Sequence, residues 1–183
     1  AGWVITHWQV RHLSQTAPGK PQERGQCSAH RTDQDQRRCP NEAFALCRPP
    51  GHHASTNIAG GFCYLNNSAI AAQELRAKYD RVAILDVDLH HGNGTQHIFY
   101  DRSDVMTLYI HADPDDFYPF FWGYAEEIGE DAGIGFNHNA PLPLGSGDVV
   151  FLDALDRTLA KIDDFGADAI VVALGLDASR DDP

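Results

Sequence analysis

Carboxylate and imidazole side chains gather where two apolar segments of the sequence end. Asp86, Asp88 and His90 alternate at the end of one segment, and Asp177 ends another. In an extended chain, residues two apart point to the same side, so the first three share one face. Carboxylates and imidazoles together bind divalent metals, and a catalytic metal keeps one position open for water or substrate. One aspartate alone would be better explained as a cap of the next turn, but four converging polar groups predict a metal site.

Two adjacent histidines form a second candidate group. His52 and His53 follow a rigid pair of prolines and a glycine, and two neighbouring imidazoles can carry protons beside a metal-bound water. Shortly after them, Gly60 and Gly61 permit a close approach of the backbone, and Phe62 could wall a narrow tunnel. These residues predict proton transfer next to the metal.

The pattern of the chain indicates which elements must position these groups. Three continuous apolar runs predict strands buried on both faces: residues 81–87, 105–111 and 168–176. Capping residues or helical spacing predict helices near them: residues 66–79, 95–100 and 147–162. A long loop is expected over residues 112–146. Alternating strands and helices predict an α/β fold with a parallel sheet and helices on both faces, whose functional groups lie beyond the carboxyl ends of the strands.

Several motifs occur in order along the chain: Arg48-Pro49-Pro50-Gly51-His52-His53, Gly60-Gly61-Phe62-Cys63-Tyr64-Leu65-Asn66-Asn67 and Asp86-Val87-Asp88-Leu89-His90-His91-Gly92-Asn93-Gly94-Thr95. Together they resemble the zinc-dependent histone deacetylase family, and Asn93 is similar to its class II branch and bacterial relatives. Residues 109–114 and 120–127 resemble more narrowly the bacterial acetylpolyamine amidohydrolases. The resemblance covers about residues 44–183 and implies an arginase/deacetylase-like fold, incomplete at both ends.

The resemblance implies catalytic roles for four matched residues. His53 would be the general base and His52 its electrostatic partner. Asp86 would orient His52, and Asn93 would face His53. Hydroxide attack on an amide carbonyl would then give a tetrahedral oxyanion, and a histidine would protonate the leaving amine.

The resemblance also implies two metal ions. Asp88, His90 and Asp177 would hold zinc, which would polarise the amide carbonyl and acidify a water. A structural potassium ion would take oxygens from Asp86 and from the backbone of Asp88 and His90. The family's potassium site usually includes a serine hydroxyl where this chain has Tyr109, so that ligand differs.

A tunnel of acyl-lysine size is implied as well. Gly61 and Phe62 would line it, opposite an aromatic residue of segment 117–121 that we assign to Tyr118. The substrate would be a cationic acetylated small molecule such as an N-acetylated polyamine, or an acetyl-lysine peptide, and the products acetate and a free amine. The four cysteines form no C-x-x-C pair and are expected to be free thiols in a reducing compartment, so we expect a cytoplasmic protein. We also expect the full-length protein to be a homodimer.

Two parts of the family pattern have no match in these residues. The family's catalytic tyrosine would lie beyond position 183, so we expect residues 1–183 alone to be inactive or barely active. Residues 1–43 do not resemble the family and remain unassigned. We expect a disordered or aberrant segment there, because residues 14–43 hold no large apolar side chain. Residues 44–183 are predicted to be a partial deacetylase-like catalytic domain.

Two other functions were weighed against deacetylation. A binuclear ureohydrolase of the arginase type needs further carboxylates where this chain has Gly92 and Ser179, so a second metal is not expected. A non-catalytic protein that binds acetylated amines would keep zinc and the tunnel. It would have no need of proton carriers, and the pair His52 and His53 therefore favours an enzyme.

Net charge points to the same class of substrate. The 183 residues carry a formal charge of −12, which disfavours direct binding of nucleic acid through its phosphates. Residues 1–46 hold six basic and four acidic side chains, so the acidity belongs to the remainder. Between Arg102 and Arg157 eleven acidic residues occur with no lysine or arginine, which fits an acidic rim for a cation or a solvated acidic face. No apolar run is long enough to cross a bilayer, and no signal peptide is predicted.

Overall fold

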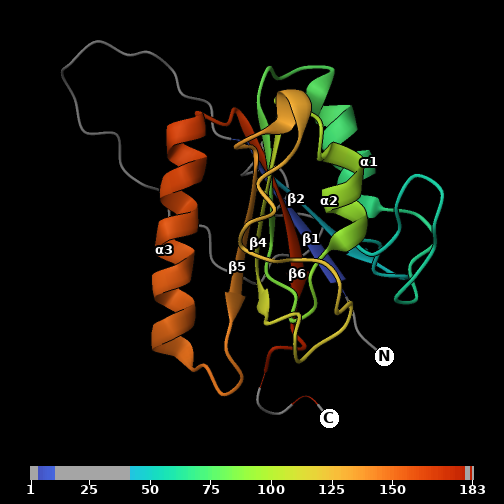
Figure 1. The fold of residues 1–183 in the computed structure, drawn as a ribbon. Helices are drawn as coiled ribbons and strands as arrows, with labels where there is room; N and C mark the ends of the chain where they lie inside the picture. The colour runs from blue at the N-terminus through green and yellow to red at the C-terminus, as the bar shows by residue number, and fades with distance from the viewer. Residues whose placement is uncertain (1–3, 11–41, 180–181, 183) are drawn as a thin grey trace.

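One six-stranded sheet organises the chain. The computed structural model describes residues 4–10, 42–179 and 182. The strands are β1 (Val4–Val10), β2 (Glu42–Cys47), β3 (Val82–Asp86), β4 (Val105–Ala112), β5 (Asn137–Leu142) and β6 (Ala169–Gly175). The α-helices are α1 (Asn67–Arg76), α2 (Asn93–Phe99) and α3 (Asp148–Phe165), and residues Asp131–Gly133 form a short 3₁₀ helix. The strand order is β2-β1-β6-β3-β4-β5 (Figure 1).

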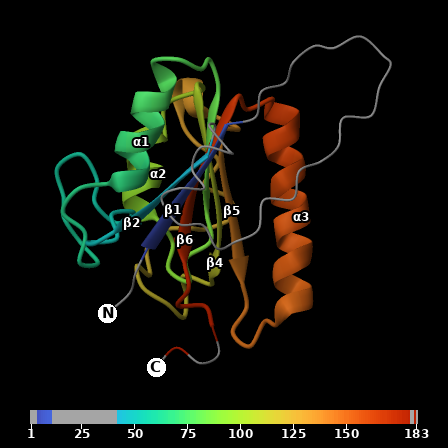
Figure 2. The same cartoon turned by 180° about the vertical axis from the view of Figure 1, so that it is seen from behind.

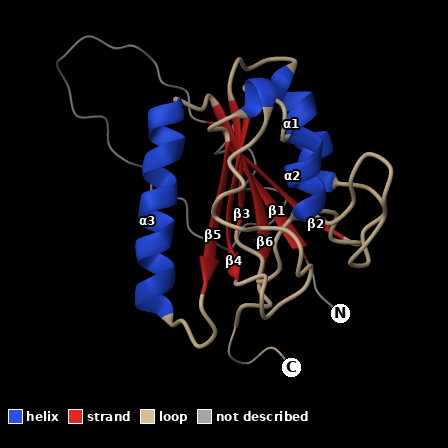
Figure 3. Cartoon of the chain, in the orientation of Figure 1, coloured by secondary structure: helices blue, strands red, loops and turns tan. Residues whose placement is uncertain are grey.

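Four adjacent strands run parallel to one another, from the middle of the sheet to one edge: β6, β3, β4 and β5. Helices α1 and α2 cover one face of the sheet and α3 covers the other, as the views in Figures 2 and 3 show. Each face has its own apolar core: Val82 and Ile84 pack toward α1, whereas Leu85 and Leu108 pack with Ile162 of α3. The predicted parallel α/β sheet with helices on both faces is therefore confirmed.

The elements begin and end for local reasons. Helix α1 starts after Asn66, whose side chain accepts a hydrogen bond from the Ala69 backbone N–H at 2.9 Å. Helix α3 ends at Gly166, which takes the left-handed conformation (φ +69°) that closes a helix without steric cost. Within the described part of the chain, no helix combines the length and apolar character needed to cross a membrane.

Three strands differ from the sequence expectations. Strands β1 and β2 pair antiparallel with each other, and β1 pairs antiparallel with β6, so one edge of the sheet is not parallel. Strand β5 lies inside the segment expected to be loop, because its asparagines and Pro141 are uncommon in strands and are accepted here at a sheet edge. Within residues 1–43, which were expected to be disordered or aberrant, residues 4–10 form β1 and residues 42 and 43 begin β2; the others lie outside the described residues.

Candidate metal centre and histidine pair

The turn after strand β3 is held by hydrogen bonds to the carboxylates of Asp86 and Asp88. Asp86, the last residue of β3, is buried, and its Oδ1 accepts a hydrogen bond from the Asp88 backbone N–H at 3.1 Å. The Asp88 Oδ1 in turn accepts one from the His90 backbone N–H at 2.9 Å. These side-chain contacts hold the backbone in the turn that points Asp88 and His90 to a common place.

The neighbouring strand β6 supplies the third group. Asp177 follows β6, and its Oδ1 accepts a hydrogen bond from the Leu89 backbone N–H at 2.9 Å. The Asp177 Oδ2 lies 2.8 Å from His90 Nδ1, which is also 3.3 Å from Asp88 Oδ1. Because β3 and β6 are adjacent parallel strands, groups 87 residues apart in sequence meet at one edge of the sheet.

A close approach of the two strands brings this cluster together. A Cβ at Gly175, the last residue of β6, would lie 2.7 Å from the Asp88 Cα and would overlap the Asp88 carboxylate. Only a residue without a side chain fits there. One ligand atom from each of Asp88, His90 and Asp177 lies within 4.8 Å of the others.

The three groups suit a divalent cation. Hydrogen bonds to Asp177 and then to Asp88 raise the pKa of His90 to about 10, so the two carboxylates stabilise a positive charge at this point. A metal ion held by the same atoms would take the place of that proton. Two carboxylates and one imidazole form a ligand set that zinc accepts, and the His90 side chain, which is 33% exposed, leaves one side of the cluster open.

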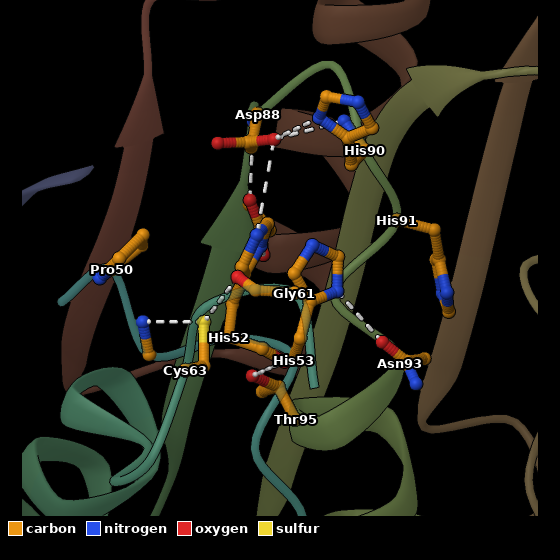
Figure 4. Close-up of polar contacts among 12 residues, drawn as sticks. Pro50, His52, His53, Gly61, Cys63, Asp88, His90, His91, Asn93 and Thr95 are labelled. Atoms are coloured by element: carbon orange, nitrogen blue, oxygen red, sulfur yellow. Dashed lines mark hydrogen bonds and ion pairs between the residues drawn. The ribbon is translucent and has the colours of Figure 1, made fainter. Parts of the chain in front are cut away.

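The histidine pair lies directly beneath this cluster (Figure 4). The two rings have centroids 4.1 Å apart, and each Nδ1 has a different partner. His52 Nδ1 lies 2.8 Å from Asp86 Oδ2, and His53 Nδ1 lies 2.8 Å from Asn93 Oδ1. The His52 Nε2 approaches Asp88 Oδ1 at 3.9 Å, which connects the pair with the carboxylates of the cluster.

These different partners shift the pKa values of the two imidazoles in opposite directions. Burial lowers the pKa of His52, but the charge and hydrogen bond of Asp86 outweigh it and raise the pKa to about 9. Burial and then the charge of His52 lower the pKa of His53 to about 3, because Asn93 offers it no carboxylate. The pair therefore combines a protonated and a neutral imidazole at neutral pH.

Helix α2 and Asn66, the residue that caps α1, support the loop that carries the pair. The Thr95 backbone N–H donates to the His52 carbonyl at 3.1 Å, and Asn66 Nδ2 donates to the Ala54 carbonyl at 2.9 Å. At Gly94 the helix lies so close to this loop that an added Cβ would come within 2.5 Å of the carbonyl carbons of His53 and Ala54.

Replacing Gly94 with alanine is accordingly expected to destabilise the fold, although alanine normally favours a helix. The new methyl group meets backbone atoms that cannot move aside, so the free energy of unfolding should fall by about 1–3 kcal/mol. Denaturant unfolding measures it, with Gly147→Ala as the control because nothing lies within 4 Å of a Cβ there. Equal stability of the two variants would show that the loop does not rest on α2 as described.

Two of the three expected tunnel residues contact the histidine pair. A Cβ at Gly61 would lie 2.6 Å from the His53 Cγ, so this glycine allows the loop to pass over the ring. The Tyr118 ring packs edge-on to the His53 ring at a centroid distance of 5.0 Å, and lies 6.4 Å from the His90 ring. Phe62 is 90% exposed, so its side chain stands mainly in solvent.

Sequence reasoning missed several residues around the site. The Cys63 Sγ, a buried free thiol, accepts a hydrogen bond from the Gly51 N–H at 2.9 Å and so fixes the turn before the pair. His91 points away from Asp88 and His52 (Figure 4), and its ring packs between those of Tyr109 and His111 at 4.6 and 4.7 Å. No spacing in the sequence distinguishes these buried partners from ordinary core residues.

Comparisons with known proteins agree with the arrangement of the site. The histone deacetylase domain matches residues 25–183. The chain is 55% identical over 141 residues to the acetylpolyamine amidohydrolase of Burkholderia pseudomallei. The aligned residues cover 77% of this chain and 41% of that relative. The chain is 56% identical over 142 residues to acetylpolyamine amidohydrolase 1 of Pseudomonas aeruginosa, with the same two coverages.

Its fold is similar to those of solved relatives as well. The crystal structure of acetylpolyamine aminohydrolase from Burkholderia pseudomallei superposes with a TM-score of 0.75 at 55% identity, covering 76% of this chain and 41% of that one. The chain thus spans about two fifths of the length of the curated relatives it matches. Since the domain match extends over most of its residues, the chain belongs to the histone deacetylase family.

Proposed function

We propose that the protein containing this chain is a zinc-dependent deacetylase that releases acetate from N-acetylated amines. The observation that carries the proposal is one juxtaposition: three metal-ligand groups within 4.8 Å of one another, directly above two histidines whose Nδ1 atoms face a carboxylate and an amide oxygen. Deacetylase and amidohydrolase relatives support the reaction class.

Zinc would be held by Asp88, His90 and Asp177, and when bound it polarises the amide carbonyl and acidifies a water. The chain's own groups then handle the protons. His53 is neutral and faces the substrate side beneath Tyr118, so it accepts the proton of the attacking water. His52, kept protonated by Asp86, stabilises the negative charge that develops next to it.

His53 also returns the proton. Once it has taken a proton from water, it is the acid closest to the departing amine, and Asn93 fixes its Nδ1 so that Nε2 serves both transfers. The family's catalytic tyrosine, a further donor to the oxyanion, has no match among these residues. Losing one such donor costs about 10²–10³ in rate, so residues 1–183 alone would turn over slowly or not at all.

An acetylated polyamine is the substrate we favour over an acetyl-lysine peptide. The loop after β4 carries Tyr118 over the histidine pair and includes the acidic residues Asp113, Asp115 and Asp116. Without lysine or arginine from 103 to 156, this loop attracts the free ammonium group of the substrate. Two relatives, both named acetylpolyamine amidohydrolases, support the same choice.

Substrate preference is tested on the whole protein loaded with zinc. We expect kcat/KM for an N-acetylated diamine or polyamine to exceed that for an acetyl-lysine peptide by at least about tenfold, because the acetyl-lysine side chain carries no free ammonium group. Acetate release measures both reactions. Raising the salt concentration should reduce the difference, since screening weakens long-range attraction. A preference for the peptide would overturn the polyamine assignment but leave the deacetylase intact.

The two other functions make different predictions in the same preparation. A binuclear ureohydrolase would bind two metal ions, but a side chain at Gly92 would overlap the Asp86 carboxylate and come within 3.0 Å of the Tyr109 Cε1. No carboxylate fits there to hold a second ion. A protein that only binds acetylated amines would show affinity without acetate release, and the unequal histidine pair argues against it.

Three further features complete the proposal. A potassium ion would take oxygens from Asp86 and from the backbone of Asp88 and His90; the Tyr109 hydroxyl, buried without a hydrogen-bond partner among the described residues, offers one more oxygen. The free thiols of Cys47 and Cys63 suit a reducing, cytoplasmic compartment. The whole protein would act as a homodimer on small cationic substrates, without binding nucleic acid.

A further inference from the structure

The aromatic segment, residues 117–124, carries Tyr118 against the histidine pair, but most of its aromatic side chains are exposed. Tyr118 packs on His53 at 5.0 Å, yet Phe120, Phe121 and Trp122 are 47%, 80% and 44% exposed. Segments with little buried apolar area are the first to open. The position of Tyr118 therefore depends on how the two ends of the aromatic segment are tied to the body of the protein.

One end is tied by the backbone. The Ala112 N–H donates to the Leu89 carbonyl at 2.8 Å, and the Asp113 N–H donates to the Leu142 carbonyl at 3.0 Å. These bonds continue strand β4 into the start of the loop, and the Phe117 N–H donates back to the Asp113 carbonyl at 3.1 Å. Backbone pairing of this kind does not depend on any particular side chain.

At the other end, one carboxylate makes several of the contacts that hold the segment. Glu127 Oε2 accepts hydrogen bonds from Gln96 Nε2 at 2.6 Å, from the Gly123 backbone N–H at 2.9 Å and from Asn139 Nδ2 at 3.4 Å. Gln96 belongs to α2 and Asn139 to β5, so this side chain joins the end of the aromatic segment to a helix and a strand. Gly123 itself fits against two rings, since a Cβ there would lie 2.8 Å from atoms of His91 and His111.

The donors around this carboxylate have fixed directions. Gln96 Oε1 accepts from both Asn137 Nδ2 and Asn139 Nδ2 at 3.0 Å, which turns the amino group of Gln96 toward Glu127. The same amides also hold main-chain oxygens of the loop: Asn137 Nδ2 donates to the Glu127 carbonyl and Asn139 Nδ2 to the Tyr124 carbonyl. Two donors, Gln96 Nε2 and the Gly123 N–H, converge on one oxygen, and the Asn139 amino group lies 3.4 Å from it, so the site accepts a carboxylate better than an amide.

We propose that Glu127 is a positioning residue, which anchors the aromatic segment so that Tyr118 stays against His53 and sets how tightly an acetylated amine is held. The proposal rests on the proposed deacetylase function for its substrate and on the contacts above for its geometry. Glu127 lies outside the metal cluster and the histidine pair. Its removal should therefore weaken substrate binding and leave the chemical step intact.

The test compares Glu127→Ala with Glu126→Ala in the whole, zinc-loaded protein. Glu126 is the exposed neighbour with the same charge, which makes it a matched control. For Glu127→Ala we expect KM for an N-acetylated polyamine to rise about tenfold, the effect of losing hydrogen bonds to a charged group, with kcat within about twofold and zinc content unchanged. Glu126→Ala should leave KM within about twofold, the part due to net charge alone.

Chymotrypsin cleavage provides a second measurement that needs no turnover. The aromatic segment offers several cleavage sites, and we expect cutting within residues 117–124 to be about tenfold faster in Glu127→Ala than in Glu126→Ala or the unchanged protein. Glu127→Gln, which keeps an acceptor for Gly123 but turns an amide toward Gln96, should lie between them. This milder variant serves if the alanine variant does not fold.

The outcomes separate the two proposals. An unchanged cleavage rate and an unchanged KM in Glu127→Ala would overturn the positioning role, and so would a fall in kcat with KM unchanged. If the unchanged protein hydrolyses no acetylated amine, the proposed function fails, and the cleavage rates alone decide whether Glu127 anchors the aromatic segment.

Discussion

Replacing Asp177 with alanine is expected to remove bound zinc and to lower deacetylase activity by more than about 10³-fold. Asp177 is the one group of the metal cluster that comes from β6, and its Oδ2 lies 2.8 Å from His90. Without it, one imidazole and one carboxylate remain, too few for a tetrahedral catalytic site. The loss of Lewis-acid stabilisation of the oxyanion then raises the activation free energy by several kcal/mol, and each 1.4 kcal/mol slows the reaction about tenfold.

Metal analysis and acetate release on the same purified sample check this expectation. Asp164→Asn is the control, because its replacement also removes one negative charge. Asp164 is an exposed residue at the end of α3, just before β6 begins, and therefore lies away from the carboxyl end of β6 that Asp177 follows. The control should keep one zinc per chain and full activity. Retention of stoichiometric zinc by the Asp177 variant would show that the cluster of Asp88, His90 and Asp177 is not the metal site.

Replacing His53 with alanine is expected to lower kcat by about 10²–10⁴, with zinc retained and KM little changed. The reason is that His53 is the neutral imidazole of the pair, so it is the group able to take a proton from water at neutral pH. Steady-state kinetics and metal content measure the two parts of the effect. His97→Ala on the exposed face of α2 removes an imidazole of ordinary surroundings and should leave both unchanged.

His52 provides the informative contrast to His53. Since Asp86 keeps it protonated, its replacement should also reduce kcat, but through lost stabilisation of negative charge and not through lost proton transfer. Activity of the His53 variant should therefore recover in part on adding free imidazole, and that of the His52 variant should not. A fully active His53→Ala enzyme would refute the assignment of His53 as general base.

Much of the fold could be predicted from the sequence because its parallel strands are continuous apolar runs. Strands β3, β4 and β6 begin and end within a residue or two of the predicted segments, and the carboxylates after β3 and β6 meet because adjacent parallel strands end at the same edge. Strand β5 escaped prediction because a polar edge strand with a proline has no apolar alternation to detect. The antiparallel pairing of β1 depends on a partner more than 150 residues away.

The candidate site divides in the same way. Residue types and spacing predicted that Asp88, His90 and Asp177 would lie together, and the resemblance supplied the pairing of His52 with Asp86. Neither could predict the anchor at Glu127, because its three donors come from a loop, a helix and a strand that only the folded chain brings together. Side-chain hydrogen bonds between distant segments leave no periodic signal in a sequence.

The two carboxylates that end β3 and β6 have a thermodynamic consequence for the sheet. An ion held jointly by Asp88 and Asp177 would connect two segments that lie far apart along the chain and end adjacent parallel strands. Because such an ion binds only when β3 and β6 are paired, it would also stabilise the centre of the sheet in proportion to its free concentration. The cation that supplies the chemistry would thereby also make the folded state of the protein depend on metal availability.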